Sequence, residues 1–355
     1  MPLISIAGVR SMVDYTLLKK LCLADGISGD ESAVREIIIE EIKDYADWRV
    51  DSLGNLLVHK KGKARAKARL ILSAHMDEVG LMVTDITSGG FLKFDEVGGI
   101  DRRVLAGKSV AVGRKNVPGV IGIKPVHLCK GDESKNIPEY SDMYIDIGAD
   151  SLDEALGVVG YGDSVRYVSD FIETETTINA KAIDDRFGCL VLIELIKSEL
   201  DFDMDFAFVV QEEVGLRGAK TAAYTLDPEF ALVMETTTSA EIPEIDKSKQ
   251  VCTLGDGAVI SVMDRRTIYD KEMVSFAFDL AEKVGVKAQY KRAVAGGNDS
   301  GAIHQSRAGV RTLAISLACR YLHAPSTVAA KSDCESIIAL AKELSNQIAG
   351  GALKK

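Results

Sequence analysis

Residues 70–78, with the sequence LILSAHMDE, predict a buried strand that ends in residues able to bind a metal ion. The apolar run 70–74 has the usual length of a strand and no helical periodicity. It leads directly into His75, Asp77 and Glu78. Because functional sites of open α/β sheets gather just beyond the carboxyl ends of the strands, we place the candidate site here.

Three other strand-like runs are also followed by acids or a histidine. Residues 206–210 lead to Glu212 and Glu213, 230–234 to Glu235, and 310–317 to His323, whereas Asp184 stands at the start of a predicted helix. Taken singly, such residues are usually structural histidines, surface acids or helix caps. Carboxylates at the ends of buried strands, however, are costly to desolvate unless they are paired or bound to metal. Together they indicate one site.

The order of predicted elements gives the fold class, an α/β sheet layer interrupted by a β-rich insert. Helical and strand patterns alternate in residues 1–78 and again in residues 173–355, which we assign to one catalytic domain. Between them, residues 79–172 contain short β-like runs separated by glycines, typical of a small β domain. At a finer level, Ser28–Glu31 and Ser332–Glu335 fit the capping box that opens a helix.

Composition excludes several classes of partner. The net charge of −10 argues against nucleic acid, because phosphate binding requires a basic surface. No apolar run approaches the roughly 20 residues of a membrane span, and the N-terminus lacks the basic and apolar regions of a secretory signal. The six cysteines show no CxxC spacing, which favours buried thiols. We therefore predict a cytoplasmic protein.

Two histidines and three carboxylates suit two ions of the Zn²⁺ or Co²⁺ type. Two divalent ions roughly 3.5–4 Å apart need negative charge between them, so one carboxylate must bridge, and Asp184 is the candidate. His75 and Glu235 would complete one ion, and Glu213 and His323 the other.

Two further acids receive catalytic roles. Glu212 is adjacent to a predicted ligand but should point to a different side, which leaves it free to act as the general base. Asp77 lies two residues after His75, where it could accept a hydrogen bond from the second imidazole nitrogen.

These motifs together resemble the tetrahedral-shell (TET) aminopeptidases, also known as glutamyl or deblocking aminopeptidases and as CelM-type endoglucanases. The matching segments, in the family's order, are 73–80 (SAHMDEVG), 182–186 (AIDDR), 211–219 (QEEVGLRGA), 296–304 (GGNDSGAIH) and 320–325 (RYLHAP). Position 235 departs from the pattern, since it is Glu here and often Asp in the family.

The resemblance implies a mixed-sheet metallopeptidase domain between helices, with the insert folded as a barrel-like dimerisation domain. It also implies twelve subunits in a hollow shell, two zinc or cobalt ions per subunit, and short peptides as substrates. The expected activity is that of an aminopeptidase. The alternatives are a related two-metal N-acyl amino acid deacylase or deblocking enzyme, a glycosidase, and a shell protein without activity.

Overall fold

The computed structural model describes residues 13–353. The decisive stretch forms β3 (Leu70–His75), in which every residue is buried. β3 runs parallel to β12 (Met204–Val209) on one side and to β13 (Phe230–Thr238) on the other, and β16 (Arg311–Arg320) continues the parallel arrangement beyond β13. A parallel strand is covered on both faces, which explains why these runs are continuously apolar.

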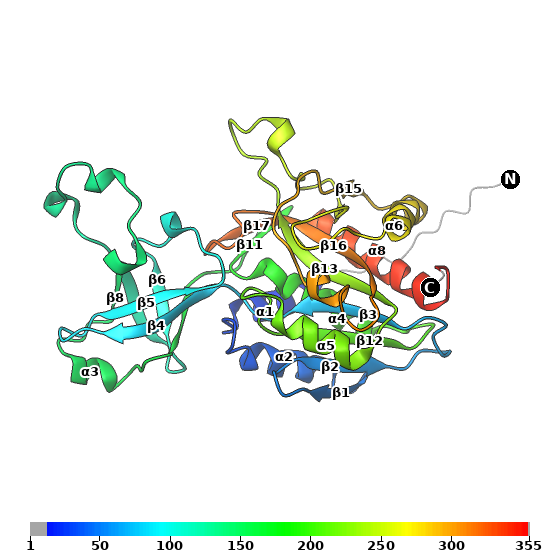
Figure 1. The fold of residues 1–355 in the computed structure, drawn as a ribbon, viewed down its shortest axis with the longest axis horizontal. Helices are drawn as coiled ribbons and strands as arrows, with labels where there is room; N and C mark the ends of the chain where they lie inside the picture. Colours follow the sequence, from blue (N-terminus) through cyan, green and yellow to red (C-terminus); the bar gives the residue numbers. More distant parts are fainter. Residues whose placement is uncertain (1–12, 354–355) are drawn as a thin grey trace.

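Antiparallel strands flank this parallel centre, so the sheet is mixed, as predicted (Figure 1). The main path runs in the order β1-β2-β12-β3-β13-β16-β17-β11-β10, and β14 and β15 pair beside β16. The flanking strands are β1 (Asp47–Val50), β2 (Leu56–Lys60), β10 (Ile172–Glu173), β11 (Thr177–Ala180), β14 (Ala258–Ile260), β15 (Ala288–Tyr290) and β17 (Thr327–Ala330).

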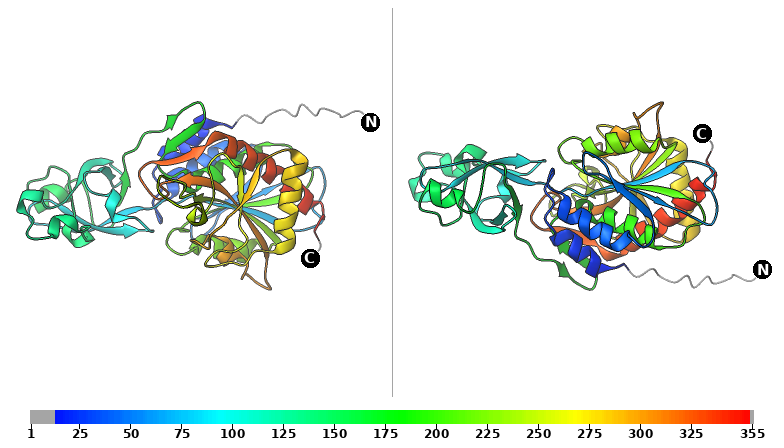
Figure 2. Two further views of the ribbon diagram at one scale, coloured as in Figure 1. Left: turned by 90° about the horizontal axis from the view of Figure 1, so that it is seen from above. Right: turned by 90° about the horizontal axis from the view of Figure 1, so that it is seen from below.

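Helices lie on both sides of the sheet (Figure 2). They are α1 (Tyr15–Leu23), α2 (Ser32–Ile42), α4 (Ile183–Lys197), α5 (Arg217–Leu226), α6 (Lys271–Val284), α7 (Ser300–Ile303) and α8 (Lys331–Ala349). α6 has a side-chain cap at its start and a glycine at its end, since the Asp270 side chain accepts a hydrogen bond from the Met273 N–H and Gly285 ends the helix with φ of 73°.

The insert forms a closed barrel that stands apart from the large sheet (Figure 1). Its strands, which we call the barrel, are β4 (Gly80–Ile86), β5 (Leu92–Val97), β6 (Ser109–Val112), β7 (Val117–Gly122), β8 (Tyr144–Asp146) and β9 (Ser164–Tyr167), with the short helix α3 (Leu152–Leu156) beside them. The barrel has a hydrophobic core of its own, separate from that of the large sheet. This arrangement confirms the predicted fold class.

Both predicted capping boxes are wrong. α2 begins at Ser32, and the Ser28 hydroxyl instead donates a 2.6 Å hydrogen bond to the Asp77 carboxylate. α8 begins at Lys331, and Asp333 accepts hydrogen bonds from the N–H groups of Gly255 and Gly257. The Ser28 side chain is thus used in a tertiary contact, and near the start of α8 it is Asp333, not the predicted Ser332, whose side chain binds backbone N–H groups, in a distant segment.

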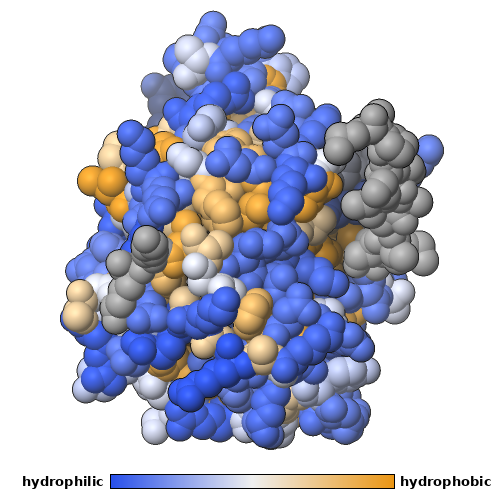
Figure 3. Space-filling model, turned by 90° about the vertical axis from the view of Figure 1, so that its right-hand side faces the viewer, coloured by the Kyte–Doolittle hydropathy of each residue, from blue (hydrophilic) through white to orange (hydrophobic). Residues whose placement is uncertain are grey.

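Hydrophobic residues gather on one side of the surface. Figure 3 shows the side farthest from the barrel, where hydrophobic residues form a patch within a mostly hydrophilic surface.

Among residues 13–353, no helix combines the length and apolar character needed to cross a membrane. The six cysteines are free thiols, and five of them are buried. The predicted absence of a secretory signal concerns mainly residues that lie outside those the structure describes.

Candidate active site

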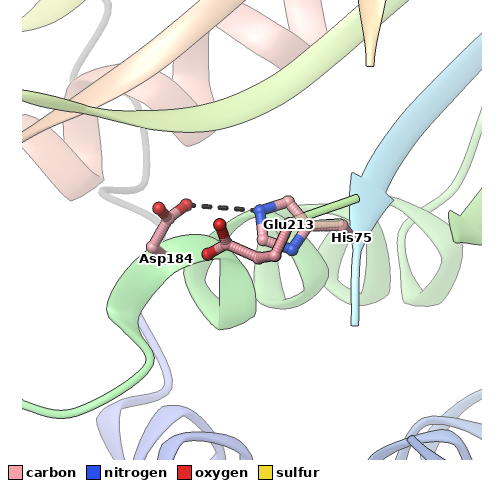
Figure 4. Close-up of side chains that lie close together, drawn as sticks. All are labelled: His75, Asp184 and Glu213. Atoms are coloured by element: carbon pink, nitrogen blue, oxygen red, sulfur yellow. Dashed lines mark ion pairs between the residues drawn. The ribbon is translucent and has the colours of Figure 1, made fainter. Parts of the chain in front are cut away.

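The parallel strands bring the predicted residues to one edge of the sheet. His75 is the last residue of β3, Glu212 and Glu213 follow β12, and His323 follows β16. Asp184 comes from the first turn of α4. Figure 4 shows Asp184 and Glu213 turned toward His75, with the ion pair between Asp184 and His75 drawn as a dashed line.

Asp184 lies between the two histidines. Its Oδ1 atom is 3.3 Å from Nε2 of His75, and its Oδ2 atom is 3.2 Å from Nε2 of His323. Each carboxylate oxygen therefore faces a different imidazole. This is the geometry expected of a carboxylate shared between two neighbouring cation positions.

The remaining two carboxylates divide between the same histidines. Oε1 of Glu235 is 3.6 Å from Nε2 of His75, and Oε1 of Glu213 is 3.3 Å from Nε2 of His323. We expected Glu235 to follow a strand that ends at residue 234. Instead it lies within β13, which continues to Thr238. The backbone pairing of β13 with β3 ends at Val233, two residues before Glu235.

The acids of this group are poorly satisfied by protein atoms alone. The buried atoms Oδ1 of Asp184, Oε1 of Glu213 and Oε2 of Glu235 have no hydrogen-bond partner in the described part of the chain. Burial raises the pKa of Glu213 to about 8 and that of Glu235 to about 7. Buried carboxylate oxygens without hydrogen-bond donors are costly unless a cation neutralises them, so the donor set fits divalent metal.

Two groups of three residues could each hold a metal ion, because their donor atoms lie within 4.8 Å of one another. They are His75–Asp184–Glu213 and His75–Asp185–Glu235. The second includes Asp185, which the sequence analysis did not select. We favour Asp184 as the ligand, because the Asp185 carboxylate already accepts hydrogen bonds from the N–H groups of His75 and Gly188.

Asp77 organises the loops around the site. Its Oδ1 accepts the Glu212 N–H at 3.0 Å, and its Oδ2 accepts the Glu213 N–H at 3.1 Å. Nδ1 of His75 lies 3.5 Å from the Asp77 carboxylate and 3.1 Å from the Asp77 backbone carbonyl. The residue thus lies beside both the imidazole and the predicted base.

Glu212 is buried and takes no part in the ion pairs with the two histidines. Burial raises its pKa well above the usual range, the charge of His75 opposes this rise, and Glu235 and Asp299 add to it. An acid whose environment favours the protonated form can accept a proton and return it, as a general base must.

Sequence reasoning missed two buried groups near the site. Both carboxylate oxygens of Asp299 are buried without a hydrogen-bond partner among the described residues, and burial raises the pKa of Asp299 well above its usual range. Burial lowers the pKa of Lys291, while Asp264 and Glu235 oppose that shift. The motif at 296–304 offered a signal for Asp299, whereas nothing in the sequence singled out Lys291.

A buried ionic cluster joins the segments that carry His75 and Asp184. Lys181 Nζ lies 2.5 Å from the Glu78 carboxylate, and Arg186 lies 3.2 Å from the same group. Arg186 also donates a 2.8 Å hydrogen bond to the carbonyl of Met76. These contacts hold the end of β3 against the start of α4, and hence His75 against Asp184.

The chain is similar to known aminopeptidases in sequence and fold. A putative aminopeptidase of Acetivibrio thermocellus is 41% identical over 332 residues, which cover 93% of this chain and 97% of that protein. The crystal structure of a TET aminopeptidase from the marine sediment archaeon Thaumarchaeota archaeon SCGC AB-539-E09 superposes with a TM-score of 0.90 at 36% identity, covering 94% of this chain and 96% of that one. The Pyrococcus horikoshii TET1 peptidase, described as assembling into a tetrahedron or a large octahedral shell, gives 0.82 at 38% identity, with 93% and 98% covered.

The fold, the site and these relatives define a hydrolase that acts on peptide bonds. The family model for M42 glutamyl aminopeptidase matches residues 54–340, and the chain belongs to this family. The resemblance to the TET aminopeptidases is thereby confirmed. Membership of this metallopeptidase family implies divalent metal ions as cofactors.

Proposed function

We propose that this chain is an aminopeptidase that holds two divalent ions, of zinc or cobalt, with Asp184 as the bridge. The observation that carries the proposal is the placement of the two Asp184 oxygens, one toward His75 and one toward His323. Glu235 would complete the ion at His75, and Glu213 the ion at His323. The unpartnered oxygens of these acids support the same assignment.

Bound ions would polarise the scissile carbonyl and lower the pKa of the attacking water toward neutrality. Glu212 accepts the proton of that water at its carboxylate and then donates it to the leaving amine. Asp77 holds the Glu212 backbone through the 3.0 Å hydrogen bond, which fixes where the side chain of the base begins. Its contact with His75 keeps that imidazole oriented toward Asp184.

The preferred substrates are short peptides with a free N-terminus. A substrate ammonium group suits this site, because the site contains more acids than the ligands alone, including Glu212 and Asp299. The second candidate is the related deacylase or deblocking enzyme, which would accept an acylated N-terminus. A glycosidase needs only an acid and a base beside the sugar, and neither it nor an inactive shell protein accounts for the five converging ligands.

One peptide in two forms, free and N-acetylated, incubated with and without chelator, tests the proposal. We expect stepwise release of single residues from the free form, slow or no cleavage of the acetylated form, and loss of all cleavage after chelation. Mass spectrometry of the products measures each outcome. Zinc or cobalt added back should restore the activity.

The other outcomes separate the alternatives. Removal of an acetyl-amino acid would favour the deblocking enzyme, and internal cleavage of both forms would show an endopeptidase. Full activity in chelator, with no metal found by elemental analysis, would refute the two-metal proposal.

We further propose that residues 79–172 form the domain that joins subunits into dimers, and that the dimers build a dodecamer. The barrel's own core supports a separate unit, and the segment beyond β7 exposes apolar side chains, among them Val126 at 75% and Leu128 at 54%. The relative from Pyrococcus horikoshii is described as forming shells.

Light scattering should then give a particle mass several times the 38.3 kDa of one chain. A charged replacement in the exposed segment, Val126→Asp, should shift the particles toward smaller species. The same substitution at Val168, an exposed residue outside that segment, serves as the control. An active enzyme that stays strictly monomeric would contradict the assembly proposal alone.

A further inference from the structure

A loop between the strands of the barrel contacts His323, one of the proposed metal ligands. The loop that follows β5 contains Gly98 and Gly99, and the Gly99 carbonyl lies 2.8 Å from Nδ1 of His323. When Nδ1–H donates to this carbonyl, the lone pair of His323 is on Nε2, the atom that faces Asp184 and Glu213. The carbonyl therefore fixes both the tautomer and the orientation of the ring.

The neighbouring glycine packs against a second ligand. A Cβ atom at Gly98 would lie 2.8 Å from Cγ1 of Val79 and 3.2 Å from Cβ of Glu213, and the φ of Gly98 is +81°. Only glycine fits this combination of space and backbone conformation without movement. The loop after β5 thus contacts both His323 and Glu213.

A third contact holds the segment that carries His323. Ser169, two residues after β9, donates a 2.8 Å hydrogen bond from its hydroxyl to the carbonyl of Pro325. This segment follows β16, and both Tyr321 and His323 have positive φ, at 60° and 61°. A backbone in this conformation depends on surrounding contacts, and the barrel side of the molecule supplies two of them.

The histidine of the other proposed ion position, His75, is not held by contacts from the barrel. His75 is 1% exposed, and its polar contacts are to Asp77, Asp184, Asp185, Cys189 and Glu235, none of which belongs to the barrel. The side chain of His323 is 29% exposed. The two positions therefore differ in what holds their histidine in place.

We propose that the barrel positions His323 and Glu213, and so sets the affinity of one of the two metal positions and not of the other. This inference rests on the proposed function. It gives the barrel a role in the site in addition to assembly. Loss of a hydrogen bond that orients a metal-bound histidine typically weakens metal binding by about 10–100-fold.

The test compares Gly98→Ala with Gly148→Ala in the full-length protein. Both glycines have positive φ, +81° and +77°, but a Cβ at Gly98 must displace the loop, whereas a Cβ at Gly148 would meet no atom within 4 Å. Co²⁺ is titrated into chelator-stripped protein by calorimetry, and the visible absorption of each bound ion is recorded. We expect Gly98→Ala to weaken one of the two binding steps by about 10–100-fold, and Gly148→Ala to weaken neither.

A second pair avoids any change in the loop backbone. Ser169→Ala removes the hydrogen bond to Pro325, whereas Ser164→Ala removes a comparable one, 3.2 Å long, between β9 and Asp30, which does not reach His323. Ser169→Ala should weaken the same binding step as Gly98→Ala, and Ser164→Ala should leave both steps as in the wild type. If Gly98→Ala does not fold, this pair decides.

The outcomes separate this inference from the proposed function. A wild-type protein that binds fewer than two ions would refute the two-metal proposal, and with it the inference. Two tight ions in the wild type, in Ser169→Ala and in folded Gly98→Ala would overturn the inference alone. Equal weakening of both ions in Ser169→Ala would also overturn it, because the barrel would then support the whole site.

Discussion

Replacing Glu212 by glutamine should leave both metal ions bound and lower kcat by about 10²–10⁴-fold. The amide has nearly the shape of the carboxylate but cannot accept the proton of the attacking water. Glu212 makes no ion pair with His75 or His323, so the ligands should stay in place. Metal content by elemental analysis and kcat on a short free peptide measure the two effects.

Glu199→Gln is the matched control, since it makes the same chemical change at an 88% exposed side chain that pairs with Lys63 and not with the site. It should behave as the wild type. If Glu212→Gln kept a near-native kcat, another group would have to be the base. If it lost metal as well as activity, Glu212 would instead belong among the ligands.

Replacing Asp184 by alanine should remove metal and activity together. Among residues 13–353, Asp184 is the one carboxylate with ion pairs to both histidines, and loss of this proposed bridge would leave each proposed ion with fewer protein ligands. Although burial opposes it, the neighbouring imidazoles of His323 and His75 hold the pKa of Asp184 well below its usual range, so this group is ionised and available to cations. We expect kcat to fall at least as far as the roughly 10²–10⁴-fold loss of a general base.

Asp205→Ala provides the comparison for this variant. Asp205 also pairs with a histidine, at 2.7 Å from Nδ1 of His59, but that pair is largely exposed. The control should keep metal and activity, because exposed pairs contribute little. An Asp184→Ala protein that still bound two ions with native affinity would move the bridge elsewhere, and Asp185 would be the next candidate.

The fold was predictable where hydrophobic pattern and length agree. The buried parallel strands and the glycine-separated runs of the barrel, such as β4 and β6, follow from such patterns. The short strands β10, β14 and β15 did not stand out, because two or three residues carry no period. β13 was predicted too short, since its last residues are an acid and three threonines that the pairing with β16 keeps in the strand.

The site was predictable to the extent that the carboxyl ends of the strands meet at one edge of the sheet. His75, Glu213 and His323 converge because their strands are parallel neighbours or neighbours once removed. The contacts that surround the site could not be predicted from the sequence. No spacing rule connects Ser28 to Asp77 or Gly99 to His323, because those contacts join segments about 50 and 220 residues apart. The roles of the site residues, the domain limits and the cytoplasmic location remain predictions.

The order of the ligands along the chain has a consequence for biosynthesis. His75 is made first among the proposed ligands, and His323, which follows β16, is made last. β16 adds to the sheet beside β13, which precedes it in the chain. A growing chain on the ribosome therefore lacks one proposed metal ligand until the segments that carry the other four have been translated. The newly made peptidase cannot complete its proposed cutting centre while those segments are still emerging.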